Sequence, residues 1–253
     1  MHKFFAKTAF LGKNVISLPE CHSTNDLLMD YARLGNARQG TIVMTDFQSI
    51  GKGQRGNQWE SEPGANLLFS LLLEPTYLEP KHQFYLSLAL ALSTVNAIER
   101  LGGDQRGLEV KWPNDLYLED KKLGGILLES SLSGHNIEFI VIGMGLNVAQ
   151  LHFVNEQATS LKLAGIEVEK ETLLEEILLQ LEETLVLLES HRFDDLLKAY
   201  YNRLRWLGVE HRFEVKGREI EATIEGIDDR GRLQLTSAGQ AILCDLKEIK
   251  FLS

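Results

Sequence analysis

The sequence predicts an α+β protein whose central mixed or antiparallel sheet is flanked by helices, followed by a small β-barrel domain. Up to about residue 207, apolar or β-branched runs of strand length are interspersed with helical segments. Three strand-like segments between residues 108 and 130 follow one another closely, which favours antiparallel pairing. After residue 208 the pattern changes to short alternating strands separated by turn signals. We therefore expect a main domain over residues 1–207 and a barrel over residues 208–253.

The composition and charge limit the classes of function that the chain can have. Its 253 residues, with 44% hydrophobic and 25% charged residues, suit one large domain with a small appendage. The formal net charge is −10. Binding to the backbone of DNA or RNA normally needs a basic face, so nucleic acid is not expected as the main partner. A local basic pocket can still exist in an acidic chain.

Neither a membrane segment nor a disulfide framework is expected. No apolar run reaches the roughly 18 residues that a membrane-spanning helix needs. The start of the chain lacks a long apolar core and a usual cleavage site, so a signal peptide is not expected. Cys21 and Cys244 lie far apart and form no CxxC pair, which also disfavours a zinc site. We expect a cytoplasmic protein without a membrane partner.

The first half of the chain alternates between helices and strands. The cluster Ser23–Asp26 is a helix start signal, and apolar residues with helical spacing follow it. Thr41–Thr45 is β-branched and predicts a strand, and the polar, glycine-rich segment 46–66 predicts a loop. The apolar run Asn66–Leu73 predicts a strand that is buried on both faces. Pro80–Leu101 is rich in alanine and leucine and predicts a buried helix.

Four strands and a helix are expected next. Asp120-Lys121 alone separates the expected strands Asp115–Glu119 and Lys122–Ser130, which predicts a tight hairpin. Leucines at helical spacing, with glutamates opposite, predict an amphipathic helix over Thr172–His191. The expected strands are Leu108–Trp112, Asp115–Glu119, Lys122–Ser130 and Ile137–Val148.

The last segment predicts five short strands. Turn signals separate them at Lys216-Gly217 and at residues 228–231 and 238–240. A barrel of about 45 residues is too small to be very stable unless it docks on the main domain.

The segment Gly51-Lys52-Gly53-Gln54-Arg55-Gly56 fits the pattern G-x-G-x-x-G. A nicotinamide dinucleotide site needs a helix after this pattern, but residues 57–65 include Pro63-Gly64 and have no apolar periodicity. Without a helix, the glycines still let backbone N–H groups approach an anion, and Lys52 and Arg55 add positive charge. We expect a phosphate or carboxylate to bind here; a solvated surface turn is the alternative.

A second candidate site combines Lys111-Trp112-Pro113-Asn114-Asp115 with the lysine and glycines that follow it. Glycine inside a strand often marks the close approach of a ligand, and Gly124 and Gly125 come directly after Lys122-Leu123. Strand alternation predicts that Lys122, Gly124 and Ile126 share one face, from which the lysine can reach a pocket. The alternative is that Lys122 is a solvated charge of the hairpin turn.

Taken together, the motifs closely resemble those of the biotin protein ligases over about residues 18–150. The motifs, in chain order, are Ser23-Thr24-Asn25, Gln48 to Gly56 followed by Trp59, Gly64 to Leu67, Lys111 to Asp115, Lys122 to Ile126 and Gly143 to Asn147. The terminal barrel is similar in length and pattern to the SH3-like C-terminal domain of that family. The resemblance implies a core akin to class II aminoacyl-tRNA synthetases. It also implies that ATP activates biotin to biotinyl-5'-AMP, from which biotin passes to a lysine of an acceptor protein.

The resemblance implies a role for each matching residue. Those implied to contact biotin are Ser23, Thr24, Asn25, Gln48, Gly51, Lys52, Gly53, Gln54, Lys122 and Gly124. Those implied to contact ATP are Arg55, Trp59, Asn114, Lys122 and Asn147. Those implied to act in catalysis are Lys122, Arg55, Lys111 and Asp115, with Lys122 as the main cation. Mg2+ is implied to accompany ATP, and the sequence leaves its protein ligands open.

The implied partner is a biotin carboxyl carrier protein, or the corresponding domain of a biotin-dependent carboxylase. A free strand edge of the main sheet can support a homodimer, as in many relatives. The residues before Ser23 are too few for the helix-turn-helix that some members carry, so operator DNA is not expected as a partner. A biotin or nucleotide sensor without turnover is the alternative from another functional class.

The glycine loop departs from the family pattern. Members commonly have GRGR where this chain has Gly51-Lys52-Gly53-Gln54, so an adenylate-facing arginine is replaced by uncharged Gln54. Either Arg55 or Lys122 compensates for the missing charge, or the adenylate is held less tightly.

Overall fold

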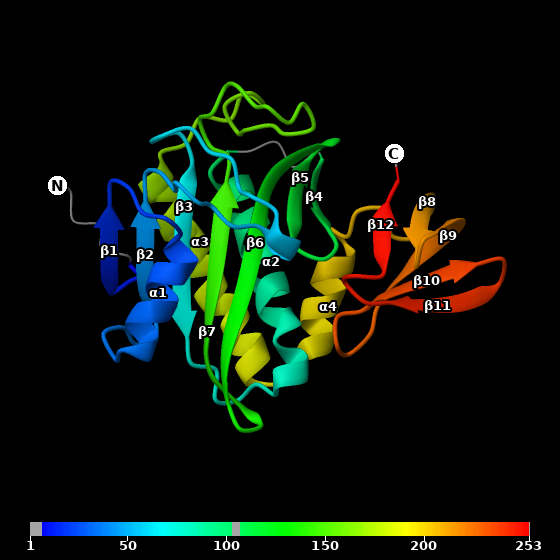
Figure 1. Cartoon of the computed structure of the whole chain (residues 1–253), viewed down its shortest axis with the longest axis horizontal. Helices are drawn as coiled ribbons and strands as arrows, with labels where there is room; N and C mark the ends of the chain where they lie inside the picture. The colour runs from blue at the N-terminus through cyan, green and yellow to red at the C-terminus, as the bar shows by residue number, and fades with distance from the viewer. Residues whose placement is uncertain (1–6, 103–106, 253) are drawn as a thin grey trace.

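The computed structural model describes residues 7–102 and 107–252 and contains two sheets (Figure 1). The first six residues, which fall in the segment where no signal peptide is expected, lie outside this description. The large sheet has the order β1-β2-β3-β7-β6-β5-β4, and its neighbours are antiparallel except for β1 and β2. The prediction of a mixed sheet is therefore confirmed. Its strands are β1 (Asn14–Leu18), β2 (Thr41–Thr45), β3 (Leu67–Leu73), β4 (Leu108–Lys111), β5 (Asp115–Leu118), β6 (Lys121–Ser133) and β7 (Asn136–Leu146).

Helices cover both faces of this sheet (Figure 1). Alternate side chains of β2 and β3 pack on opposite faces of the sheet, because successive strand residues point in opposite directions. Ile42 and Phe69 join the core beneath α2 and α3, whereas Val43 and Leu72 pack with Leu28 of α1. None of the helices in the described residues combines the length and the apolarity needed to cross a bilayer. The helices are α1 (Thr24–Arg33), α2 (Phe84–Arg100), α3 (Lys170–Glu189) and α4 (Phe193–Tyr201), with 3-10 turns η1 (Gln54–Gly56) and η2 (Pro80–His82).

Most elements lie where the sequence predicts them. Strand β2 has the predicted residues, and α1 begins directly after Ser23, whose hydroxyl accepts a hydrogen bond from the backbone N–H of Asp26. The helix predicted from Pro80 instead begins at Phe84, because residues 80–82 form a 3-10 turn. Strand β1 and helix α4 were not predicted. The interval between β5 and β6 is the expected tight hairpin, and Leu118 pairs with Lys121 across it.

The predicted barrel is present as a five-stranded antiparallel sheet in the order β11-β10-β9-β8-β12. Within the described residues, the strand pairings do not join the two outer strands into a closed barrel. The hairpin between β8 and β9 turns at Lys216-Gly217. Both residues have positive φ, as the two central residues of a type I′ hairpin turn require. The strands are β8 (Glu210–Val215), β9 (Arg218–Ile227), β10 (Leu233–Ser237), β11 (Gln240–Cys244) and β12 (Ile249–Phe251).

The small sheet docks against the main domain next to the turn between β4 and β5. Trp112 is 2% exposed, and its indole Nε1 donates a hydrogen bond to the backbone oxygen of Gly231 at 2.8 Å. Gly231 has φ +78°, and a Cβ atom there would overlap the ring of Phe84. A glycine is thus needed for this close approach. The docking brings β12 beside the β4–β5 turn.

Two adjacent tyrosines at the end of α4 give a test of this packing. The hydroxyl of Tyr200 is buried and has no hydrogen-bond partner in the described part of the chain, whereas Tyr201 donates to the oxygen and accepts from the N–H of Ile227. We expect Tyr200→Phe to raise the free energy of unfolding by about 1 kcal/mol and Tyr201→Phe to lower it by about 1 kcal/mol. Urea denaturation measures both. A loss of stability in Tyr200→Phe would contradict the assignment of an unsatisfied hydroxyl.

Candidate active site

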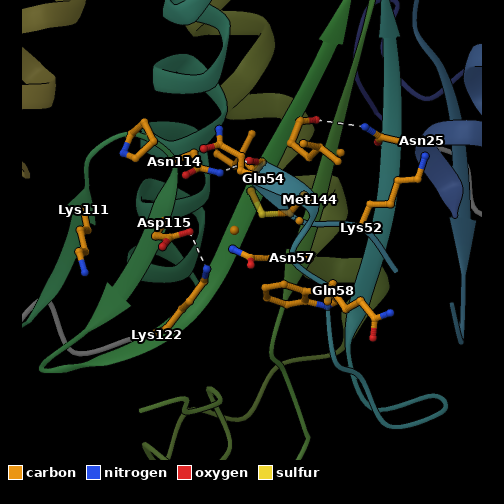
Figure 2. A pocket seen from close by; sticks show the side chains of 18 of the residues that line it. Asn25, Lys52, Gln54, Asn57, Gln58, Lys111, Asn114, Asp115, Lys122 and Met144 are labelled. Carbon is orange, nitrogen blue, oxygen red and sulfur yellow. Dashed lines mark hydrogen bonds and ion pairs between the residues drawn. The ribbon is translucent and has the colours of Figure 1, made fainter. Parts of the chain in front are cut away.

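A cavity of about 310 Å³ lies beside the N-terminal end of α1, between the glycine loop, the β4–β5 turn, β6 and β7 (Figure 2). Strand β12 also lines it. It brings together side chains that are far apart in the sequence. The sequence-predicted residues that line it are Ser23, Thr24, Asn25, Gln48, Lys52, Gly53, Gln54, Trp59, Lys111, Asn114, Asp115 and Lys122. Most of the predicted site is therefore assembled around one cavity.

On the side of the cavity formed by β6 and β7, three positions carry no side chain: Gly125, Gly143 and Gly145. Gly125 pairs with Gly145 across the two strands. A Cβ atom at Gly145 would overlap the indole of Trp59, and one at Gly143 would overlap Oδ1 of Asn25. Bare backbone at these positions thus lets a planar indole and a planar amide lie against the sheet. These glycines belong to the predicted motifs, but their position on one shared face was not predicted.

The expectation that Lys122, Gly124 and Ile126 share one face is wrong. The register between β5 and β6 shifts by one residue at Leu123, which is a β-bulge and reverses the alternation. A Cβ atom at Gly124 would enter the apolar core, whereas one at Gly125 would point at the side chain of Lys122. Gly125, rather than Gly124, therefore lines the cavity with Lys122.

Lys122 and Asp115 form an ion pair that lines the cavity beside Gly125. Their Nζ and Oδ1 atoms are 2.7 Å apart, and the two side chains are 31% and 24% exposed (Figure 2). The ammonium group also lies 5.8 Å from the centroid of the Trp59 ring. A half-buried ion pair that borders a cavity presents a cation whose position is fixed by its partner. The reading of Lys122 as a solvated turn charge is thus disfavoured.

Asn114 fixes the β4–β5 turn onto β6. The residue is 8% exposed, and its Nδ2 donates a hydrogen bond to the backbone oxygen of Ile126. The N–H of Ile126 donates to the backbone oxygen of Asn114 at 3.0 Å. This reciprocal pair keeps Lys111 and Asp115, on either side of the turn, next to Lys122.

Lys111 lies in a half-buried position where three aromatic rings meet its ammonium group. Burial lowers the pKa of this ammonium; Asp115 opposes the shift, and the cations Lys122 and Arg205 add to it. The neighbouring wall is formed by residues 249–251 of β12. No site residue was predicted in this strand, because nothing in a short terminal strand indicates which surface it will approach.

A network of polar side chains forms the other side of the cavity. The backbone N–H and hydroxyl of Thr24 donate to Oε1 of Gln48 at 2.8 and 3.1 Å. The hydroxyl of Ser70 donates to Oδ1 of Asn25 at 2.6 Å and lies 2.7 Å from Oγ1 of Thr24. Nδ2 of Asn25 donates to Oε2 of Glu129 at 2.8 Å. Ser70 and Glu129 were not predicted, and their contacts fix donors and acceptors that can bind a neutral polar group.

The glycine loop is tied to α1 by an ion pair. Lys52 Nζ lies 2.5 Å from Oδ1 of Asp26, and this hydrogen bond is the main reason that the pKa of Lys52 is raised. The loop closes on itself, because Trp59 N–H donates to the oxygen of Gly51 at 2.9 Å. A Cβ atom at Gly51 would lie 2.7 Å from the oxygen of Trp59, so this position also needs glycine. Gly51 therefore supports the loop without lining the cavity formed by the described residues.

Of two further predicted nucleotide contacts, Asn147 does not line the cavity and the side chain of Arg55 is not described. Asn147 is 3% exposed, and its Nδ2 donates to the oxygen of Thr159 at 2.9 Å, so it fixes the segment after β7. The side chain of Arg55 lies outside the part of the structure that is described. The role predicted for Arg55 therefore stays a prediction.

Comparison with known proteins places the chain in a family. The family model described as "Biotin/lipoate A/B protein ligase family" matches residues 18–147, and that described as "Biotin protein ligase C terminal domain" matches residues 207–249. The bifunctional ligase/repressor BirA of Escherichia coli is 33% identical over 234 residues, covering 90% of this chain and 71% of BirA. The biotin--[acetyl-CoA-carboxylase] ligase of Mycobacterium tuberculosis is 28% identical over 232 residues, covering 90% and 85%.

The same relationship appears in three dimensions. The structure of the biotin protein ligase from Aquifex aeolicus in complex with biotin and ATP matches with a TM-score of 0.78 and 27% sequence identity, covering 94% of this chain and 98% of that one. The fold, the order of the motifs and both sequence matches agree. The chain belongs to the biotin protein ligase family.

Proposed function

We propose that the chain activates biotin with ATP to biotinyl-5'-AMP and transfers the biotin to a lysine of a biotin carboxyl carrier protein or domain. One observation carries this proposal: a single cavity joins the neutral hydrogen-bonding side chains of Thr24, Asn25 and Gln48 to the ammonium groups of Lys111 and Lys122. In Figure 2, Asn25 lies on one side of the cavity and the two lysines on the other. This arrangement suits a ligand with a neutral polar head and an anionic tail.

The activation step needs cations because both reactants are anions. A carboxylate oxygen of biotin attacks the α-phosphorus of ATP, the new C(O)–O–P linkage forms, and the bond to pyrophosphate breaks. Bringing the two anions together costs Coulomb energy, which fixed positive groups offset without reorganisation during the reaction. Lys122 is positioned for this by Asp115, and Lys111, which pairs with Asp115 across the β4–β5 turn, lines the same cavity.

The transfer step needs a neutral amine. The acceptor ammonium group loses one proton to solvent and its nitrogen attacks the carbonyl carbon of the mixed anhydride. The C–N bond forms, the C–O bond to AMP breaks, and the nitrogen loses its second proton to solvent as AMP leaves. Among the described residues that line the cavity, Asp115 is the one carboxylate. We assign to it the orientation of the incoming ammonium group, in competition with its ion pair to Lys122.

The polar network supports biotin over lipoate as the substrate. The ureido head of biotin is rigid and carries paired donors and acceptors, which Thr24, Gln48 and Asn25 can match. A site built for such hydrogen bonds rejects an apolar dithiolane, because its buried polar groups would be left unpaired.

Magnesium is proposed to enter with ATP rather than to occupy a site of the protein alone. The described residues contain no group of three or more His, Cys, Asp or Glu side chains that could hold a metal ion. Mg2+ commonly uses one or two carboxylates together with phosphate oxygens and water. Asp115 fits this pattern as the cavity carboxylate, and the ion would neutralise phosphate charge there.

The strand edges of the large sheet support a homodimer as a proposal, and the net charge supports the proposal that DNA is not bound. Strand β1 is the outer strand of the large sheet, whereas the other outer strand, β4, is covered by hydrogen bonds between Val110 and residues 203 and 205. The edge of β1 is where a second copy can add in a homodimer. The net charge of −10 supports the proposal that DNA is not a partner.

The proposed reaction is tested by supplying its three substrates. With biotin, MgATP and a biotin carrier domain, we expect pyrophosphate release and a biotin-labelled lysine, detected by mass spectrometry. Lipoate in place of biotin is expected to give no product. Product with lipoate alone would assign the chain to the neighbouring class of ligases, and tight biotin binding without pyrophosphate release would identify a sensor.

The role of Lys122 is tested with its neighbour as control. Lys122→Met removes the cation that faces both anions, so we expect the rate of adenylate formation to fall about 100-fold or more. The exposed Lys121 precedes it in β6, and Lys121→Met is expected to leave that rate unchanged. Rapid-quench kinetics give the rates, and thermal melts check folding. A melt that collapses in Lys122→Met would show a structural role instead.

The glycine loop is expected to close over the intermediate. The adenylate is labile to water, and a loop that orders over it limits hydrolysis. We expect backbone amides of residues 48–60 to become protected from hydrogen exchange when biotin or the adenylate binds. Mass spectrometry measures this exchange, and equal protection with and without ligand would argue against closure.

A further inference from the structure

Three aromatic rings surround the ammonium group of Lys111, and we call them the aromatic cage. Its Nζ lies 4.8 Å from the ring centroid of Phe251, 5.2 Å from that of Tyr117 and 5.5 Å from that of Trp206. The face of an aromatic ring attracts a cation within about 6 Å of its centroid. All three rings are therefore within the range of a cation–π interaction.

The cage is built from three parts of the chain. Tyr117 belongs to β5 of the large sheet, Trp206 to the segment that leads into the small sheet, and Phe251 to β12. The rings of Trp206 and Phe251 contact each other, with centroids 5.5 Å apart. Two of the three rings thus come from outside the large sheet, and the ring of Phe251 is in place only when the small sheet is docked.

The backbone of Trp206 is held in an uncommon conformation. Its φ is +61°, a region that bulky residues rarely adopt. The segment is fixed on both sides, because Arg205 N–H donates to the oxygen of Val110 at 3.0 Å and Gly208 N–H donates to that of Ile224 at 2.9 Å. The structure thus sustains a strained residue at the position that places an indole over Lys111.

A second cation, Arg205, also lies over two rings of the cage. The guanidinium carbon of Arg205 lies 4.7 Å from the ring centroid of Trp206 and 5.1 Å from that of Tyr117. Arg205 is itself paired with Glu109 and Asp120. These carboxylates neutralise Arg205 and anchor two of the rings.

The faces of the rings attract Lys111 without accepting its hydrogen bonds, and the hydroxyl of Tyr117 accepts one. Within the part of the chain that the structure describes, no carboxylate forms an ion pair with Lys111, and Asp115 is paired with Lys122. One contact, to the hydroxyl of Tyr117, is 3.4 Å long. A carboxylate would accept the N–H groups of the lysine, whereas ring faces leave them available for an anionic ligand.

We infer that Trp206 and Phe251 are positioning residues that direct the ammonium group of Lys111 at the anionic reactants, so that the small C-terminal sheet completes the active site. The inference rests on the proposed function for its consequence in catalysis. Burial, together with nearby Lys122 and Arg205, disfavours the charged form of Lys111, as the lowered pKa reflects. The aromatic cage and Asp115 offset that effect and keep a cation where phosphate binds.

A double-mutant cycle tests whether the rings act through Lys111. We expect Phe251→Leu and Trp206→Leu each to lower the rate of biotinyl-adenylate formation about tenfold. Phe251→Tyr keeps a ring and is expected to retain the rate. In a Lys111→Met background, Phe251→Leu is expected to have no further effect, because coupled residues do not act additively.

A matched variant controls for destabilisation of the small sheet. Ile242 is partly buried in β11, at the edge of that sheet opposite β12, so Ile242→Ala loosens the same core away from the cage. It is expected to lower the melting temperature and leave the rate unchanged. Additive effects of Phe251→Leu and Lys111→Met, or an equal loss of rate in Ile242→Ala, would overturn the inference.

A second measurement does not depend on activity. After reductive methylation with 13C-formaldehyde, the dimethyl-lysine signal that disappears in Lys111→Arg belongs to Lys111. We expect ring currents to move this signal upfield, and Phe251→Leu or Trp206→Leu to move it back. An unshifted signal would overturn the inference even if the protein is an active ligase. A shifted signal in a protein that forms no adenylate would overturn the proposed function and leave the cage intact.

Discussion

The active site depends on two neighbouring strands that carry no side chains at the same place. Strands β6 and β7 pair so that Gly125 lies opposite Gly145, and Gly143 lies one step further along the same face. Any Cβ atom at Gly143 or Gly145 would overlap the amide or the indole that rests there. Removing side chains from a sheet weakens it locally. The surrounding strands compensate, because β3 is buried along its whole length and pairs with β7 over seven positions.

The second constraint is the sign of the charge. The chain carries a net charge of −10, yet the described residues that line the cavity include four lysines and one carboxylate, Asp115. That carboxylate is bonded to Lys122. The local field is therefore opposite to that of the molecule as a whole, which a count of charges over the sequence cannot reveal. Field lines converge in a concave, partly buried site, so a few cations dominate there despite the acidic surface.

The sequence predicted the large sheet except β1, the helices except α4, and most cavity residues, because apolar periodicity and glycine-rich motifs are local signals. The missed features are those that only contacts between distant segments determine. Because of the bulge at Leu123, Gly125 faces the cavity in place of the predicted Gly124, and no sequence pattern in β6 predicts a bulge. Ser70 lies in an apolar run, and its polar role appears only beside Asn25. The approach of β12 to Lys111 likewise depends on docking of the small sheet, which strand patterns do not specify.

The length of β12 has a consequence for how such an enzyme loses activity. This strand pairs with β8 at three positions, whereas β6 and β7 pair at ten. Elements with few hydrogen bonds and few neighbours open first in the native state, at a fraction of the cost of global unfolding. Detachment of three residues would release one wall of the pocket while the large sheet stays folded. Warming or mild denaturant would then abolish the activity of the protein well before a spectroscopic signal of global unfolding appears.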